Sequence, residues 1–371
     1  MQEIKAILEM YHASESRGMK KALATVVHVR GSSYRRPGAR MLVLEDGSIT
    51  GAISGGCLEN DALRKARLAM ATDAPRLVVY DTSNEEDASI GVQLGCNGVI
   101  TVLFESLSDE KDPKITLLEN ILKTREPSAV VTMFYGEKQD QHPGTCVVIN
   151  SNEYFSVVFP DLNFEKLREL AARSLREQCS LNFKLPDRNG KELNTLVEFI
   201  PPPVSLVIAG AGNDAVPLIR IADTLGWDSQ IVDGRHTHLS SGRFPPACQI
   251  RLAKPEQVLE TIQPDSWTAF VLVTHNYQYD KDLLKYLLPL NVPYIGILGP
   301  KKKMERMLWE LREEGTEITE EMLMKVFGPT GLEIGAEHPS EIALSVMAEI
   351  QAVINRKAGG FLRNKTDVIH S

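Results

Sequence analysis

The sequence predicts an α/β protein with an N-terminal mixed α/β domain followed by a C-terminal Rossmann-like domain that contains a doubly wound parallel sheet. Helical and strand patterns alternate through the first hundred residues, and the run Pro201-Pro202-Pro203 then interrupts the chain. Beyond the prolines, the apolar segment 204–209 leads directly into the glycine-rich turn 210–215. Such a strand is typical of a parallel sheet buried on both faces, and a proline run is typical of a domain boundary.

These patterns divide the chain into three regions. Residues 1–105 form the N-terminal domain, and residues 201–371 form the Rossmann-like domain. Residues 106–200 form a β-rich middle region that we assign to the N-terminal domain. No internal repeat marks any of them.

The elements expected before the prolines follow from hydrophobic periodicity and turn residues. Asp46-Gly47 between two apolar runs indicates a hairpin. The expected helices are 3–15, 58–70, one near 115 and 163–178. The expected strands are 22–29, the two arms of the hairpin 41–53, 76–80, 99–104, 129–135, 145–149, 154–159 and one each near 181 and 196.

The C-terminal region begins with a βαβ unit. The strand 204–209, the turn Gly210-Ala211-Gly212, a helix through 225, a second strand 229–232 and then Asp233 follow in the order typical of a phosphate-binding fingerprint. Asp233 would accept a hydrogen bond from a ribose hydroxyl, although the nearby Arg235 leaves discrimination against a 2′-phosphate open. His275 follows another expected strand at the same edge, where it could bind a ligand or transfer a proton.

Composition limits the possible functions. The 371 residues include 24% charged and 43% apolar residues, with a net charge of −8. An acidic chain is unsuited to nucleic acid as a main partner, and no apolar stretch reaches the roughly 20 residues that span a bilayer. The first 21 residues mix charges with helical spacing and do not resemble a signal peptide. We therefore expect a cytoplasmic protein without nucleic-acid or membrane partners.

Two cysteines lie in glycine-rich turns. Gly55-Gly56-Cys57-Leu58-Glu59 precedes an expected helix, and Leu94-Gly95-Cys96-Asn97-Gly98 follows about forty residues later. Unpaired N–H groups at a helix start favour a thiolate, so Cys57 is a candidate nucleophile or soft-metal ligand. The alternative is that both cysteines are small buried side chains. The five scattered cysteines indicate neither a disulfide framework nor a zinc site.

Arg35 and Arg36 flank the Pro37-Gly38 turn and could carry an anionic ligand toward Cys57, or could simply be solvated. The chain contains no Ser-His-Asp order, Walker loop or His-Glu-x-x-His motif. Familiar hydrolase and kinase chemistry is therefore not expected.

Taken together, the motifs resemble the xanthine dehydrogenase accessory protein family (XdhC/CoxI), which comprises molybdenum-enzyme maturation factors. The N-terminal resemblance lies in Gly31-Ser32-Ser33, Pro37-Gly38-Ala39-Arg40-Met41, Asp46-Gly47 and the two Gly-Cys turns. The C-terminal resemblance lies in Gly210-Ala211-Gly212, Asp233-Gly234-Arg235, Thr274-His275 with Asp280, Tyr294-Ile295-Gly296, Leu298-Gly299, Pro329-Thr330-Gly331-Leu332 and the segment from Pro339 to Ala343. The chain departs from the family pattern at Asn213, Pro300-Lys301 and Asn97.

The resemblance implies a non-catalytic factor that binds the molybdenum-molybdopterin cofactor and delivers it to a xanthine dehydrogenase-type apoenzyme. It also implies help from a cysteine desulfurase in replacing an oxo ligand with sulfide, and a two-fold homodimer fits such a protein. The candidate cofactor-binding residues are Gly55, Gly56, Cys57, Glu59, Cys96, Arg35, Arg36, Gly210, Gly212, Asp233, Arg235 and His275, with Cys57 and Cys96 as candidate molybdenum contacts.

Two other classes of function remain open. The Rossmann fingerprint also fits an NAD(P)-dependent oxidoreductase, which would bind NADH and lose it when Gly212 becomes bulky. The paired Gly-Cys turns also fit a thiol-based redox regulator or scaffold, which would form a Cys57–Cys96 disulfide under mild oxidation.

Overall fold

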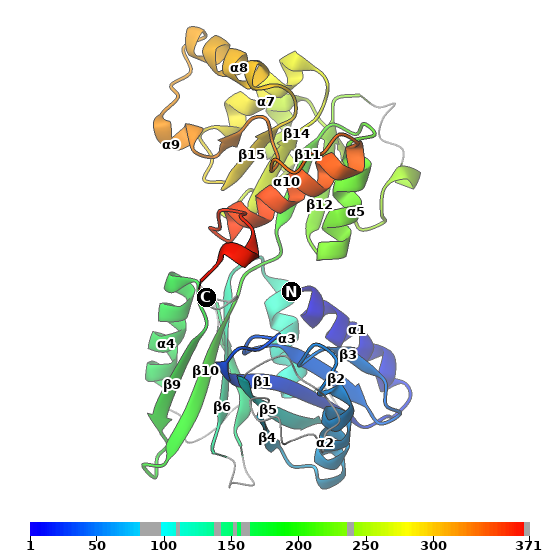
Figure 1. Cartoon of the computed structure of the whole chain (residues 1–371), viewed down its shortest axis with the longest axis vertical. Coiled ribbons are helices and arrows are strands. Elements are labelled where there is room, and N and C mark those ends of the chain that lie inside the picture. Colours follow the sequence, from blue (N-terminus) through cyan, green and yellow to red (C-terminus); the bar gives the residue numbers. More distant parts are fainter. Residues whose placement is uncertain are drawn as a thin grey trace. The chain divides into compact units, whose positions relative to one another are not determined.

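The structure is a computed structural model that describes residues 1–81, 98–108, 112–136, 142–150, 154–156, 164–235 and 241–366. The chain separates into two compact units, with unit 1 ending at Pro202 and unit 2 spanning Pro203–Thr366. Figure 1 colours the chain from blue at its N-terminus to red at its C-terminus. The fold class predicted from the sequence is confirmed, because unit 1 mixes helices with antiparallel sheets and unit 2 contains a parallel sheet.

Unit 1 contains two five-stranded antiparallel sheets. Sheet A has the order β3-β2-β1-β5-β4, with β1 (Lys21–Gly31), β2 (Arg40–Leu44), β3 (Ile49–Gly51), β4 (Arg76–Asp81) and β5 (Gly98–Leu107). Sheet B has the order β8-β7-β6-β10-β9, with β6 (Ser128–Phe134), β7 (Gly144–Ile149), β8 (Tyr154–Ser156), β9 (Leu181–Pro186) and β10 (Glu192–Ile200). The middle region thus supplies all of sheet B.

Unit 1 has a helix on the outer face of each sheet and further helices between the two sheets. The unit has four helices among its described residues, α1 (Gln2–Glu15), α2 (Glu59–Thr72), α3 (Pro113–Lys123) and α4 (Phe164–Glu177). Small side chains let α2 pack closely on sheet A, since Ala62, Ala66 and Ala69 are fully buried there. Helix α4 covers sheet B through Leu167 and Ala171.

One face of sheet A is turned toward sheet B, and the side chains of β1 alternate between that face and the outer face. On β1, Ala22 and Ala24 belong to the cluster with α2, whereas Leu23 joins a cluster with Val130 and Val148 of sheet B. Successive side chains of a strand point to opposite faces, so this alternation gives sheet A two buried faces. Helices α1 and α3 complete the cluster between the sheets.

Unit 2 is a Rossmann domain. Its six-stranded sheet C has the order β13-β12-β11-β14-β15-β16, and every pairing is parallel. This is the doubly wound order 3-2-1-4-5-6, whose topological switch point lies between β11 and β14. The strands are β11 (Ser205–Ala209), β12 (Asp228–Asp233), β13 (Gln249–Leu252), β14 (Thr268–Leu272), β15 (Tyr294–Ile297) and β16 (Val326–Phe327).

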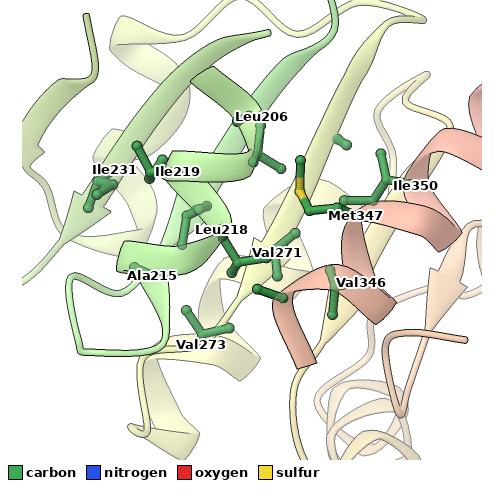
Figure 2. Close-up of a cluster of buried hydrophobic side chains, with 14 of the residues drawn as sticks. Leu206, Ala215, Leu218, Ile219, Ile231, Val271, Val273, Val346, Met347 and Ile350 are labelled. Atoms are coloured by element: carbon green, nitrogen blue, oxygen red, sulfur yellow. The ribbon is translucent and has the colours of Figure 1, made fainter. Parts of the chain in front are cut away.

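Helices lie on both faces of sheet C. They are α5 (Ala215–Leu225), α6 (Val258–Thr261), α7 (Tyr277–Leu287), α8 (Lys301–Glu313), α9 (Glu320–Leu323) and α10 (Pro339–Ile354), with 3-10 turns η3 (Ser241–Arg243), η4 (Pro255–Gln257) and η5 (Leu362–Asn364). Figure 2 shows Leu218 of α5 and Met347 of α10 packed with Val271 of β14 on one face. The other face carries α7 and α8 through Leu284 and Leu311.

Helix α8 begins at Lys301, so the run Lys301-Lys302-Lys303 forms its first turn. The expected strand 154–159 is described only over β8 (Tyr154–Ser156). Within the described residues, no helix combines the length and apolarity needed to cross a membrane.

Candidate functional site

Cys57 lies in the loop between β3 and α2, two residues before α2 begins. Its side chain is half-buried and its thiol is free. A Cβ on the neighbouring Gly55 would lie 3.5 Å from the Tyr34 ring, so that ring covers the start of the loop. Tyr34 is 67% exposed, which is high for an aromatic side chain beside a candidate site. No pattern in the sequence marks Tyr34 as a candidate, although it directly follows the Gly31-Ser32-Ser33 motif.

A hydrogen-bond chain leads from Cys57 to a carboxylate. The Cys57 thiol donates to Ser54 Oγ at 3.5 Å, and Ser54 Oγ donates to Glu59 Oε2 at 2.6 Å. Ser54 is almost fully buried, and its N–H donates to Glu59 Oε1 at 3.0 Å. Ser54 was missed because serine in a glycine-rich loop carries no distinguishing pattern. The chain connects the thiol to Glu59, a residue that the motif had already selected.

The prediction that free N–H groups surround Cys57 was wrong for its two neighbours. The Gly56 and Leu58 N–H groups both donate to Ser54 Oγ, at 3.2 and 3.1 Å. The Leu58 N–H also lies 3.1 Å from Glu59 Oε2. Ser54 and Glu59 therefore order the loop that precedes α2, whereas Leu58 at the N-cap position makes no side-chain capping hydrogen bond.

Arg35, Arg36 and Arg40 lie in three different environments. Arg35 forms an ion pair with Glu3 of α1, while Arg36 is exposed. Arg40 is buried and makes a bidentate pair with Glu198 of β10, with Nη2–Oε2 at 2.5 Å and Nη1–Oε1 at 3.1 Å. The positive charge of Arg40 therefore serves the contact between the two sheets, and the role of Arg35 and Arg36 in holding an anion stays a prediction.

Cys96 lies outside the described residues, so its distance from Cys57 is not addressed by the structure. Within the part of the chain that is described, no group of three or more His, Cys, Asp or Glu side chains is arranged to hold a metal ion. Among the described residues, Cys57 is therefore not part of a set of protein ligands for a metal ion, and its contact with molybdenum stays a prediction.

The glycine turn of unit 2 lies at the topological switch point. Gly210 has φ +118°, and a Cβ there would approach the Val273 carbonyl oxygen to 2.6 Å. Only glycine fits this close crossing between the loops after β11 and β14. Gly212 meets nothing within 4 Å in place of a Cβ, so it leaves open space beside the turn.

Asp233 is occupied by donors of its own chain. Its Oδ2 accepts from the Ala211 N–H at 2.9 Å, and Arg235 donates to both carboxylate oxygens through its backbone N–H, Nε and Nη2 at 2.8–3.0 Å. Although burial opposes ionisation, these hydrogen bonds hold the pKa of Asp233 below its usual value. A ribose hydroxyl could reach the carboxylate only by displacing Arg235, so the ribose role stays a prediction with that condition.

His275 and Asp214 bridge the loops after β14 and β11. Their Nε2–Oδ2 distance is 2.8 Å, and the His275 side chain is 63% exposed. His275 adopts φ +54°, a left-handed conformation that costs free energy for a residue with a Cβ. Arg243, which the sequence analysis missed, donates to the Ala211 carbonyl at 3.0 Å and to Asn213 Oδ1 at 2.9 Å. These contacts hold the turn in one conformation.

A second network lies beneath the same loops, and it joins Thr274 and Asp280 of the family motif to Lys303. The fully buried Asp280 of α7 accepts from Thr274 Oγ1 at 2.6 Å and from Lys303 Nζ at 2.8 Å. Lys303 also donates to the Leu298 carbonyl at 3.1 Å. Of the three lysines in the first turn of α8, Lys303 therefore fixes the helix to the carboxyl ends of β14 and β15.

Fold and site define a two-unit α/β protein in which unit 1 presents a cysteine in a glycine-rich loop and unit 2 is a Rossmann domain. The family model described as XdhC Rossmann domain matches residues 206–350, and the model of the XdhC and CoxI family matches residues 15–81. The chain is 32% identical over 328 residues to a probable xanthine dehydrogenase subunit of Bacillus subtilis (strain 168), covering 88% of this chain and 91% of that protein. The chain therefore belongs to the XdhC and CoxI family, as its motifs predicted.

Two further similarities extend over most of the chain. The molybdenum cofactor insertion chaperone PaoD of Escherichia coli (strain K12) is 25% identical over 336 residues, covering 91% of this chain and 84% of PaoD. A crystal structure of a xanthine dehydrogenase from Bacillus halodurans has 29% sequence identity and a TM-score of 0.74, covering 96% of this chain and 98% of that one. Both units are therefore shared with these proteins.

Proposed function

We propose that this protein binds the molybdenum cofactor and inserts it into a xanthine dehydrogenase-type enzyme. The observation that carries the proposal is the similarity to a molybdenum cofactor insertion chaperone over 91% of the chain. The names of the relatives in Bacillus subtilis and Bacillus halodurans support xanthine dehydrogenase as the class of client. Transfer of a sulfido ligand by a cysteine desulfurase, and a homodimeric state, belong to the same proposal.

Cys57 is the proposed contact to molybdenum. A thiolate is a soft ligand suited to a sulfur-rich metal centre, and this thiol is free and partly accessible. The bond requires the thiol to lose its proton. In the proposed step, that proton passes to Ser54 Oγ while the Ser54 hydroxyl proton passes to Glu59 Oε2, along contacts of 3.5 and 2.6 Å. The carboxylate becomes a neutral acid and Cys57 carries the charge that binds the cargo.

The test is cofactor content in proteins purified without oxygen from a host that makes the cofactor. Molybdenum is measured by mass spectrometry and pterin by the fluorescence of its oxidised form. Cys57→Ala is expected to lose both, whereas the matched control Cys179→Ala, at an exposed cysteine beyond α4, is expected to keep both. Equal pterin and molybdenum in the two variants would contradict the role of Cys57, and absence of both from wild type would contradict the proposed function.

The relay has its own measurement. Glu59→Gln retains the size of the side chain but accepts a proton far less readily, so it should slow alkylation of Cys57 by iodoacetamide about tenfold at neutral pH. Ser54→Ala should have a similar effect because it breaks the chain at its centre. If alkylation of Cys57 in both variants follows the same pH profile as in wild type, the relay is contradicted, and Ser54 and Glu59 serve only to order the loop before α2.

A second candidate function is binding of a nicotinamide dinucleotide by unit 2. The strand order 3-2-1-4-5-6 and the open space beside Gly212 favour it. An NADH titration that shows micromolar affinity in wild type and none in Gly212→Leu would support this candidate. Binding that is equal in the two proteins would place NADH elsewhere and reject the fingerprint as its site.

A further inference from the structure

Unit 1 contains a groove of about 700 Å³ between its two sheets. On sheet A, Thr101 of β5 lies opposite His28 of β1 and opposite Val79 of β4, so these three side chains share one face. On sheet B, Asn194 of β10 lies opposite Phe134 of β6 and Lys184 of β9. All six line the groove.

The two faces look toward each other. Leu103, two residues after Thr101 on β5, packs in one cluster with Phe134 of sheet B. Glu198, four residues after Asn194 on β10, binds Arg40 of sheet A. Because the side-chain period of a strand is two, Thr101 and Asn194 lie on the faces defined by these contacts. The groove is therefore the part of the space between the sheets that the core does not fill.

The side chains that line the groove are partly apolar and partly able to form hydrogen bonds. Leu77, Val79 and Phe134 supply apolar surface. The Asn182 and Asn194 amides each provide donors and an acceptor, and the Thr101 hydroxyl adds both. Among the described residues, these three side chains have no hydrogen-bond partner, so their capacity is directed to the groove and to solvent.

Positive charge lies at the rim. Lys184 is exposed, and its Nζ pairs with Glu192 at 2.8 Å. Exposed pairs of this kind contribute little free energy, so an anionic ligand can exchange with Glu192 for Lys184. The exposed His28 lies opposite, on sheet A.

We propose that this groove binds a fused-ring heteroaromatic molecule that carries an anionic group, the chemistry that pterins and purine nucleotides share. The apolar side chains of Leu77, Val79 and Phe134 supply surface on which the face of such a ring can pack. The edge of such a ring alternates N–H, N and C=O groups, which amide side chains pair with well. The volume lies within the range of small-molecule sites, and Lys184 balances the anion.

The assignment of a pterin to this groove rests on the proposed function, because the pterin would be the organic part of the molybdenum cofactor. The assignment of a purine nucleotide to the groove is independent of the proposed function. Pterin-6-carboxylate and guanosine monophosphate, which both lack a metal, therefore serve as the two probes.

The experiment titrates each probe into the full-length protein by isothermal calorimetry. Asn194→Ala and Asn182→Ala are each expected to weaken binding about tenfold or more, since each loses ring-edge hydrogen bonds. The control Asn189→Ala changes an exposed asparagine in the turn after β9 and is expected to bind as wild type does. Thermal unfolding of each variant verifies that it is folded.

Tighter binding of pterin-6-carboxylate assigns the groove to the cofactor, and tighter binding of guanosine monophosphate assigns it to a nucleotide. Failure of both probes to bind below about 1 mM overturns the inference, as does equal weakening in all three asparagine variants. If wild type still co-purifies with molybdenum in that case, the proposed function survives and only the groove is excluded.

Discussion

Replacing Gly210 with alanine is expected to destabilise unit 2 by about 3 kcal/mol. The backbone there has φ +118°, a region that residues with a Cβ rarely occupy, and such strain costs roughly 1–3 kcal/mol. The new Cβ would also lie 2.6 Å from the Val273 carbonyl oxygen and 2.8 Å from the Thr274 Cα. Relieving that overlap forces the loops after β11 and β14 apart, at a further cost of roughly 1–3 kcal/mol.

The control is Gly212→Ala, whose Cβ meets nothing within 4 Å and is expected to change stability by less than about 0.5 kcal/mol. All three tryptophans, Trp227, Trp267 and Trp309, lie in unit 2, so tryptophan fluorescence reports its unfolding selectively. For a domain of this size, about 3 kcal/mol corresponds to a decrease in Tm of roughly 6–12 °C. Equal unfolding midpoints for the two variants would refute the claim that the close crossing at Gly210 excludes a side chain.

The remaining predictions concern charges and strain. Burial raises the pKa of Glu105. The contribution of this carboxyl group to the stability of unit 1 is therefore present below the unfolded pKa of 4.5 and is lost as pH rises through the folded value. Glu105→Gln should abolish this loss in hydrogen exchange of unit 1 peptides between pH 4 and pH 8, and an unchanged pH dependence would contradict the prediction. Arg40→Met leaves Glu198 without its buried partner and should lower the free energy of unfolding by about 3–5 kcal/mol. The double variant Arg40→Met with Glu198→Met should recover most of that loss in urea unfolding. Additive losses of the two single variants would show that the pair is not coupled. His275→Gly relieves the strain of φ +54° and loses only an exposed ion pair with Asp214. The free energy of unfolding of unit 2, followed by tryptophan fluorescence, should therefore stay within about 1 kcal/mol of wild type. A larger loss would mean that the His275–Asp214 pair stabilises the contact between the loops after β11 and β14.

The depressed pKa of Asp233 has the opposite linkage to that of Glu105. Its stabilising contribution is present above the unfolded pKa of 3.8 and is lost as pH falls through the lower folded value. Acid should therefore weaken unit 2 in wild type more than in Asp233→Asn. Tryptophan fluorescence between pH 2 and pH 6 measures the difference, and parallel curves would contradict it.

The sequence by itself determined the elements whose signals are local. The fingerprint from β11 through Asp233 was predicted because a strand, a glycine turn and a helix each leave a periodic or steric signature in consecutive residues. The hairpin at Asp46-Gly47 and the helix beginning near Cys57 followed for the same reason. The Gly-Cys motifs also predicted the family, because they preserve residue types in a fixed order.

Only the tertiary structure decided which side chains meet. The pairing of Arg40 with Glu198 joins residues 158 positions apart, and no local pattern distinguishes a buried arginine from the exposed Arg36 beside it. Asp233 likewise kept its predicted position, but its partner Arg235 fills the place expected for a ribose. Periodicity determines which face of an element a residue occupies, whereas packing between distant elements determines what that face contacts. The groove between the two sheets of unit 1 likewise depends on such packing and could not be predicted from the sequence.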